Sequence, residues 1–295
     1  MMRIIVGIII VTLSGLAIDR NCKLPNKLSE LEKPLSFEKL LRYNDVQRNT
    51  KKLENLCVHL LSFNEKKYHW KMLLVTNPKK STGFFWFLPH DDENSAFDSA
   101  VYATEKYGGG FLSVISNDKR YFMGQDPNRN FGTDSHTAKI CKKQHYPAPL
   151  YSKYIFEIID SYKKPNMPYL ALHNNKNGWY GNGGAGGVSI LKNSKTVKSY
   201  LSGKVLTGKF KGMKDEDNLV YIAGKKKYPN RSKLDALLSD GLHVKYEIVN
   251  ERSNDCSMSN YLVLNKGNNY YNIETEKGDV KTQRKMIDKL MNSIK

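Results

Sequence analysis

The sequence contains few cysteines and no internal repeat. Its four cysteines are far apart and form no Cys-x-x-Cys pair; they are Cys22, Cys57, Cys141 and Cys256. This spacing excludes a thiolate zinc site and a redox dithiol motif. One or two disulfides are possible in an oxidising compartment, and free buried thiols are the alternative. The absence of a collagen period, a heptad array or a short repeat excludes fibrous and solenoid proteins.

Acidic residues are scarce relative to basic ones. The 295 residues include 29 Asp and Glu against 47 Lys and Arg, a formal net charge of +18. Hydrophobic residues make up 40% of the chain, enough for a real core, so intrinsic disorder is excluded. The positive excess fits nucleic acid or any other anionic surface. Because the Lys clusters are scattered and not interleaved with aromatic residues, a solvated face is the simpler interpretation.

No apolar run is long enough to span a membrane. The longest covers Ile4 to Ala17 and has fourteen residues, whereas a helical span needs about 20. A basic start at Arg3 and small residues near Ala17 predict a signal peptide over residues 1–17, with an uncleaved anchor as the alternative. We therefore expect an exported protein, periplasmic or secreted, with no stable membrane span after cleavage. Export also argues against a nucleic-acid partner.

The pattern of apolar residues predicts an α/β fold. Residues 18–66 have apolar positions at helical spacing, over 37–41 and 53–60, and are interpreted as a helical lead-in of two modest helices. Short apolar runs after residue 67 predict strands, and helical patterns lie between them; the strand runs are 70–75, 84–88, 111–115, 168–172, 219–223, 244–249, 261–264 and 270–275, and the helical ones 95–104, 154–162 and 280–294. We expect a mixed, largely parallel central sheet flanked by helices. Since no Pro/Ser-rich linker follows residue 70, residues 67–295 are expected to form a single domain.

Two of the predicted strands run directly into histidines. The run 84–88 is followed by His90 and Glu93, and the run 168–172 by His173. Open α/β sheets place ligands in crevices beyond the carboxyl ends of their strands. Two His and one Glu, with the fourth position open, form a catalytic zinc set. The other histidines have no comparable placement, so ordinary surface or core roles are expected for them.

A third motif makes the pattern more specific. Residues 126–131 read Asp-Pro-Asn-Arg-Asn-Phe, and Glu274 lies in an apolar run near the C-terminus. In this order, the motifs resemble the zinc carboxypeptidase family of the carboxypeptidase A type, in its bacterial form. The ordered motifs extend from residue 84 to residue 278, most of the chain. The resemblance implies a single domain with a zinc-carboxypeptidase-like fold.

The resemblance also implies roles for individual residues. His90, Glu93 and His173 would bind Zn²⁺, which polarises the scissile carbonyl and lowers the pKa of its bound water to about 7. Glu274 would be the general base. Glu276 is the runner-up, because alternate residues of a strand share one side.

Three further residues would act on the substrate. Asn128 and Arg129 would bind its terminal carboxylate, Arg129 through a bidentate pairing. The alternative for Arg129 is an ion pair with Asp126 or Asp134. Arg120 is the nearest candidate for stabilising the oxyanion, although it precedes Arg129 by only nine positions, whereas the family's arginine lies well upstream.

Several neighbouring residues have open roles. Asp91 or Asp92 would either orient a ligand histidine or cap the following helix. The family's aromatic hydroxyl has four candidates: Tyr180, Tyr228, Tyr270 and Tyr271. The glycine-rich segment 178–187 lacks the phosphate-loop and dinucleotide patterns, so it is interpreted as a lip of the zinc cleft or as a plain flexible loop.

The function expected from these motifs is zinc-dependent hydrolysis of an amide bond next to a free carboxylate, by zinc-bound water with a Glu base. Export and positive charge favour cell-wall peptides as substrates, since peptidoglycan is anionic and rich in carboxylates. Two alternatives remain: an N-acyl amino acid deacylase on the same fold, and a non-catalytic basic relative that binds wall polymer or a protein.

Overall fold

The computed structural model describes residues 22–294, apart from 142, 178–186, 209–210 and 268. The predicted signal peptide and most of the glycine-rich segment therefore lie outside the described residues. Among the described helices, none is long and apolar enough to cross a membrane.

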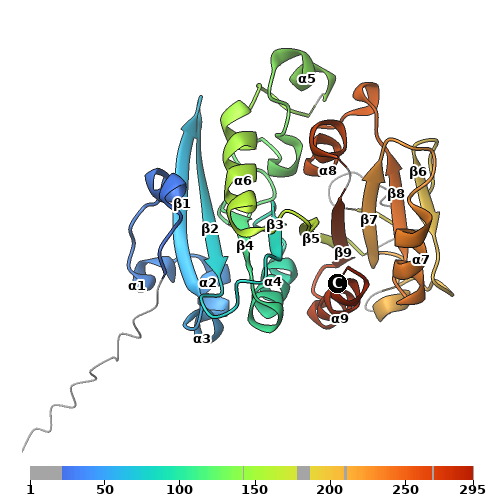
Figure 1. Ribbon diagram of the computed structural model, residues 1–295, viewed down its shortest axis with the longest axis horizontal. Helices are drawn as coiled ribbons and strands as arrows, with labels where there is room; N and C mark the ends of the chain where they lie inside the picture. The colour runs from blue at the N-terminus through green and yellow to red at the C-terminus, as the bar shows by residue number, and fades with distance from the viewer. Residues whose placement is uncertain (1–21, 142, 178–186, 209–210, 268, 295) are drawn as a thin grey trace, which may run out of the picture.

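One mixed sheet runs through the whole molecule (Figure 1). Its described strands are β1 (Cys57–Glu65), β2 (Tyr68–Thr76), β3 (Phe85–Leu88), β4 (Gly110–Val114), β5 (Tyr169–Asn175), β6 (Val197–Tyr200), β7 (Leu219–Gly224), β8 (Val244–Ile248) and β9 (Tyr270–Glu276), in the spatial order β1-β2-β4-β3-β5-β9-β7-β8-β6. The central strands β4, β3, β5 and β9 are mutually parallel, whereas β1–β2, β2–β4, β7–β9 and β6–β8 pair antiparallel. The mixed α/β prediction is confirmed: four parallel strands lie in the centre of the sheet, and β7 and β8 form a further parallel pair.

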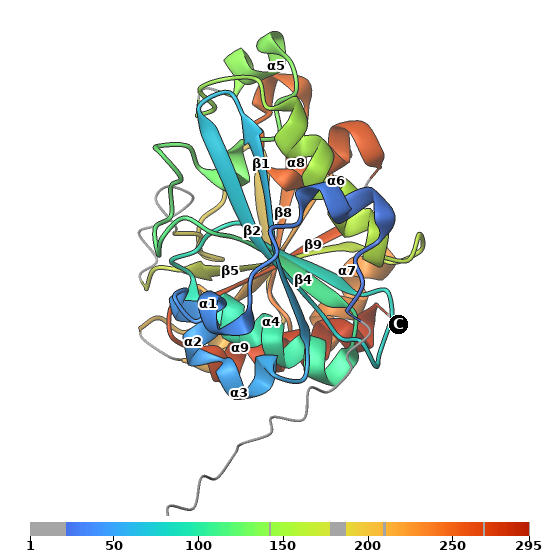
Figure 2. The same cartoon turned by 90° about the vertical axis from the view of Figure 1, so that its left-hand side faces the viewer.

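Helices cover both faces of this sheet. The described helices are α1 (Phe37–Leu40), α2 (Asn44–Arg48), α3 (Thr50–Leu53), α4 (Asn94–Tyr107), α5 (Ser135–Ile140), α6 (Pro149–Tyr162), α7 (Arg231–Ser239), α8 (Met258–Tyr261) and α9 (Val280–Ser293), with short 3-10 or π turns at Asn26–Leu31, Pro127–Arg129, Gly212–Lys214, Glu251–Ser253 and Leu262–Lys266. Helices α4 and α9 lie on one face and α6 on the other. Figure 2 shows the strands fanning out with the usual twist of such sheets.

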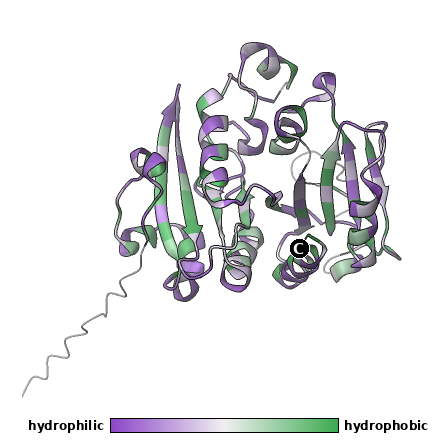
Figure 3. Ribbon diagram, in the orientation of Figure 1, coloured by the Kyte–Doolittle hydropathy of each residue, from purple (hydrophilic) through white to green (hydrophobic). Residues whose placement is uncertain are grey.

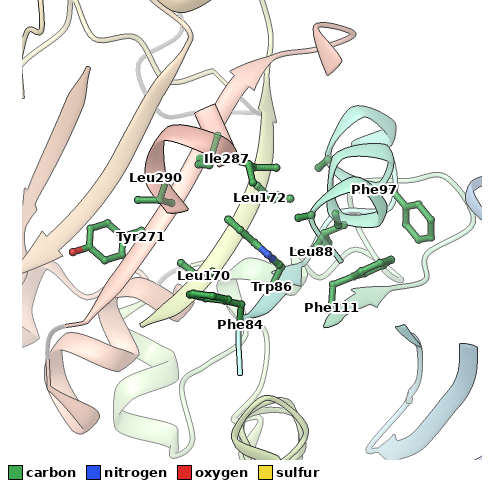
Figure 4. Packing of buried hydrophobic residues seen from close by; sticks show 14 of the residues in the cluster. Phe84, Trp86, Leu88, Phe97, Phe111, Leu170, Leu172, Tyr271, Ile287 and Leu290 are labelled. Atoms are coloured by element: carbon green, nitrogen blue, oxygen red, sulfur yellow. The ribbon is translucent and has the colours of Figure 1, made fainter. Parts of the chain in front are cut away.

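Alternate residues of the central strands pack against opposite layers. In β3, Trp86 and Leu88 join the core under α4 and α9, whereas Phe85 and Phe87 join the core under α6. Figure 4 shows Trp86 and Leu172 beside residues of α4 and α9. Because both faces are covered, the strand is apolar throughout, as buried parallel strands are. Hydrophobic colouring accordingly gathers on the strands and the sheet-facing sides of the helices (Figure 3).

The helical prediction for residues 53–60 is wrong beyond α3. Residues 57–65 form β1, which pairs along its whole length with β2. Leu60, Leu61 and Phe63 are buried in succession because chain segments cover both faces of this edge strand, so no period of two is visible. Part of the predicted lead-in thus belongs to the sheet.

Two smaller differences lie near the C-terminal half. Residues 261–264 form the end of α8 and a π turn, not a strand, because Leu262 and Val263 pack into the core from a helical backbone. Strand β6 was not predicted; all four of its residues are half-buried, so no apolar run marks it.

Two disulfides connect distant segments. Cys22 pairs with Cys57, and Cys141 pairs with Cys256. The first ties the start of the described chain to β1. The second joins the end of α5 to the segment before α8, so it supports one wall of the cleft described below.

Candidate metal centre and substrate cleft

The strand-to-helix connection after β3 positions His90 and Glu93. Helix α4 begins directly after Glu93, whose backbone carbonyl accepts from the amide of Ala96 at 2.9 Å. Glu93 and His90 are both buried, with 4% and 3% of their surface exposed. The connection therefore directs an imidazole and a carboxylate to the same point at the carboxyl end of the sheet.

Strands β5 and β9 bring His173 and Glu274 side by side. The two strands are parallel, and their register makes His173 and Glu274 direct partners. The carbonyl of His173 accepts from the side chain of Gln283 on α9 at 2.9 Å. One strand pairing thus brings together two residues that are about a hundred positions apart in the sequence.

The three predicted ligands converge. His90 Nδ1 lies 2.9 Å from Glu93 Oε1 and 3.2 Å from His173 Nδ1, and His173 Nδ1 lies 3.3 Å from Glu93 Oε2. One donor atom from each residue lies within 4.8 Å of the others. Two imidazole nitrogens and a carboxylate, buried and facing one another, match the donor set of a catalytic zinc site. The residues present therefore fit Zn²⁺.

Asp126 completes this centre, and the sequence did not show it. Its Oδ1 atom lies 2.8 Å from Nε2 of His90, on the side of the ring away from His173. A carboxylate bound to the outer nitrogen fixes the tautomer of a ligand histidine and makes it more basic. Asp126 is the first residue of the Asp-Pro-Asn-Arg motif, which marks this segment in the sequence. The motif does not show, however, that Asp126 lies next to His90.

The charges of the centre compensate one another. Burial disfavours a charged His90, but the carboxylates of Glu93 and Asp126 raise its pKa to about 9. Burial likewise opposes the charge of Glu93, yet the two histidines hold the pKa of Glu93 well below its usual value. The carboxylate of Glu93 is therefore held in its charged form, as a ligand of a cation must be.

Glu274 occupies a different environment from Glu93. It is 8% exposed and lines the cleft, and its Oε1 accepts from the side chain of Asn272 at 2.8 Å. Burial raises the pKa of Glu274, with His173 opposing the shift. A carboxylate with a raised pKa beside the ligands is suited to exchange protons.

Glu276, the runner-up for the base, is not brought to the cleft. Its carboxylate accepts from the side chain of Asn177 at 2.7 Å, and its backbone amide donates to Asn218. It is absent from the described residues that line the cleft and lies near Asp215 and Glu216. Of the two carboxylates, only Glu274 faces the substrate space.

A cleft of about 570 Å³ opens beside the ligands. Arg120 lines it and donates to Glu93 Oε1 at 3.0 Å, while its other terminal nitrogen lies 3.8 Å from Asp126. The closeness of Arg120 to Arg129 in sequence does not prevent it from reaching the centre. A guanidinium on this edge can donate to an oxygen next to the ligands.

Arg129 lies farther along the same cleft and is already paired. Its Nε is 3.0 Å from Asp255, whereas no ion pair joins Arg129 to Asp126 or Asp134 in the described part of the chain. Asn128 also lines the cleft, and its Oδ1 accepts a long bond from the amide of Met258. The end of the cleft therefore presents a guanidinium together with acidic groups, which include Glu247.

The remaining candidate residues, two aspartates and the tyrosines, differ in whether they reach the centre or the cleft. Asp91 accepts from the amides of Ser116 and Asp118, and Asp92 pairs with Lys277, so neither orients His90 and neither caps α4. Tyr270 lines the cleft, whereas Tyr228 is 58% exposed and Tyr271 packs in the core under α4 and α9. Tyr180 and most of the glycine-rich segment lie outside the described residues.

The fold has counterparts among solved structures. A provisionally named metallopeptidase from Shewanella amazonensis is 14% identical, over 88% of this chain and 92% of its own, with a TM-score of 0.44. A succinylglutamate desuccinylase from Chromobacterium violaceum is 10% identical, over 85% and 73%, with a TM-score of 0.45. A provisionally named carboxypeptidase A from Shewanella denitrificans is 10% identical, over 88% and 68%, with a TM-score of 0.41.

No family model and no curated protein matches the sequence. At such low similarity, the activity of this chain has to be inferred from its own residues.

Proposed function

We propose that this protein is a zinc-dependent hydrolase of amide bonds next to a free carboxylate. The observation that carries the proposal is the convergence of His90, Glu93 and His173 at the edge of a cleft that also holds Glu274. A bound Zn²⁺ would supply a Lewis acid for the scissile carbonyl and an activated water.

The side chains around the centre divide the remaining work. Glu274 takes a proton from the attacking water and passes it to the leaving amine, since its carboxylate is buried beside His173 with a raised pKa. Arg120 donates to the oxygen on which negative charge develops. Asp126 holds the ring of His90, so that Nδ1 stays directed at the centre.

The charges at the far end of the cleft support a proposal for the substrate end that binds there. Arg129 would bind a carboxylate, and Asp255 and Glu247 beside it would bind an ammonium group. A substrate whose terminal residue carries both a carboxylate and an ammonium group fits this end better than one whose terminal residue is apolar. Diamino acids in cell-wall peptides have this character.

The proposed location is outside the cytoplasm. Two disulfides are typical of an oxidising compartment, and they agree with the predicted signal peptide. The excess of positive charge would attract the protein to an anionic wall.

A substrate panel tests the proposal. Zinc-loaded protein is incubated with muropeptides, with peptides ending in Lys or in Ala, and with N-acetylated amino acids, and the products are separated by chromatography. Release of terminal residues, fastest from muropeptides or Lys-terminated peptides, is expected. Cleavage of the acyl amino acids alone would instead support the deacylase, and no cleavage of any substrate would support a binding protein.

A further inference from the structure

A second cluster of buried acids lies outside the zinc centre. Asp215, Glu216 and Asp217 occupy the turn between Gly212–Lys214 and β7, and each is 1% exposed. One carboxylate oxygen from each lies within 4.8 Å of the others. Three consecutive buried carboxylates are unusual in a chain with a net charge of +18.

Glu216 is the side chain that most needs a partner. Both of its carboxylate oxygens are buried, and neither has a hydrogen-bond donor among the described residues. No Lys or Arg of the described chain forms an ion pair with it. An isolated buried carboxylate is costly unless it is paired or bound to a metal.

The surroundings add negative charge to this turn. Burial, together with the neighbouring Asp215, raises the pKa of Glu216 to about 7, and burial raises the pKa of Asp215 to about 6. Glu276 contributes in the same direction to both. A cation bound here would relieve the repulsion at Glu216, whose carboxylate oxygens accept no hydrogen bond from the described residues.

The donor atoms indicate which cation fits. All three side chains offer carboxylate oxygens and no nitrogen or sulfur, which is the ligand type of hard cations. Ca²⁺ binds oxygens at about 2.3–2.6 Å, so two of its ligands lie up to about 5 Å apart. The three carboxylate oxygens, which lie within 4.8 Å of one another, are close enough together to bind one such ion.

The turn is attached to the strands that carry the zinc centre. Asn175, two residues after His173, donates to the carbonyl of Asp217 at 2.7 Å. Asn218 accepts from the amide of Glu276, two residues after Glu274, at 2.7 Å. A cation that orders the turn would therefore also hold the carboxyl ends of β5 and β9.

We propose that Asp215, Glu216 and Asp217 form a Ca²⁺ site that stabilises this turn. The site is separate from the zinc centre and does not depend on the peptidase proposal. It would fill under the Ca²⁺ concentrations outside cells, where modules with dissociation constants of about 10⁻⁴–10⁻³ M operate.

Calcium titration of the zinc-loaded protein tests this site. The wild type is stripped with EDTA, reloaded with one equivalent of ZnCl₂, and titrated with CaCl₂ by calorimetry and thermal unfolding. One Ca²⁺ per chain is expected, with a Tm rise of roughly 5 °C at saturation. Glu216→Gln should weaken calcium binding at least tenfold, whereas Glu251→Gln, at an exposed acid, should leave it unchanged.

The controls separate the possible outcomes. If Glu216→Gln fails to fold, the wild-type stoichiometry decides, with Asp215→Asn as the second variant. Absence of calcium binding in the wild type would overturn the proposal. So would equal binding by a folded Glu216→Gln protein, or displacement of the first equivalent of zinc by calcium, which would place the ion in the other centre.

Discussion

Two buried clusters lie near the carboxyl ends of the same strands, and they differ in how their charges are compensated. In the proposed zinc centre, Glu93 faces two imidazoles and Arg120. In the acidic turn, Glu216 has no donor among the described residues, although it is equally buried. Burial alone therefore does not distinguish a catalytic metal site from a stabilising one.

The difference gives each cluster its own response to metal removal. The zinc centre has an internal network that holds its side chains, so losing Zn²⁺ should remove activity more than stability. The acidic turn lacks such a network around Glu216, so losing its cation should lower stability. Substitutions of acids and of an arginine that have partners test this difference, beginning with the residue where the expected effect is largest.

The largest effect is expected at Glu274. Glu274→Gln keeps the shape and the bond to Asn272 but removes the proton acceptor, so kcat should fall by roughly 10²–10⁴-fold with zinc content unchanged. Glu276→Gln is the matched control, two residues farther on the same strand. Should the Glu276 variant lose more activity than the Glu274 variant, the base has been placed on the wrong carboxylate.

Asp126 supports the zinc centre through His90. Asp126→Asn removes the charge that fixes the outer nitrogen of the ring, so zinc affinity should weaken by roughly 10–100-fold. A competition assay with a chromophoric chelator measures this directly. Asp134→Asn, at an acid that caps α5, should bind zinc like the wild type, and an unchanged affinity in Asp126→Asn would exclude the proposed orientation of His90.

Arg129 is compensated by Asp255 and is proposed to share its charge with the substrate. Arg129→Lys loses the fork that binds a carboxylate, so KM should rise roughly tenfold, as for one lost charge-assisted bond of about 1.5 kcal/mol, with kcat less affected. Steady-state kinetics on a Lys-terminated peptide provides the test. A fall in kcat with unchanged KM would mean that Arg129 does not hold the substrate end.

The charge of Asp45 is compensated in part, less than that of Glu93 and more than that of Glu216. Burial raises its pKa to about 7 although Arg48 opposes the shift, and Asp91 and Asp98 add negative charge. Because the folded pKa lies above the unfolded one, the stability that this group contributes is present at low pH and decreases between about pH 4 and pH 7.

Asp45→Asn should remove that decrease. The wild-type free energy of unfolding is expected to fall with pH more steeply than that of the variant, by at most about 1.4 kcal/mol per pH unit. Urea unfolding at pH 5, 6 and 7 gives both slopes. Parallel slopes would show that Arg48 compensates Asp45 fully.

The sequence predicts the centre better than its surroundings. His90 and Glu93 follow an apolar strand that the sequence makes visible, and His173 and Glu274 lie near the ends of two others. Strand pairing then brings these residues together. The contact of Asp126 with His90 depends on the path of residues 116–131, which have no periodic pattern. The sequence also gives no sign that Arg129 pairs with Asp255, because more than a hundred residues separate them.

The fold shows the same limit at its edge. The central strand β3 is an uninterrupted apolar run, and the sequence predicts it closely. Strand β5 begins as such a run but continues through His173 to Asn175, three residues beyond the predicted end. At β1, apolar residues on both faces follow Leu53 at the end of α3 and Leu56 just beyond it, so spacing alone favoured a helix. The outcome there depends on pairing with β2, a tertiary contact that local spacing does not encode.

Zinc stoichiometry is the most direct test of the metal centre. Elemental analysis of purified wild-type protein should give one Zn²⁺ per chain, His173→Ala should retain almost none, and His243→Ala, at a buried histidine that interacts with Ser202, should retain one. Absence of stoichiometric zinc in the wild type, or full zinc content in the His173 variant, would contradict the account.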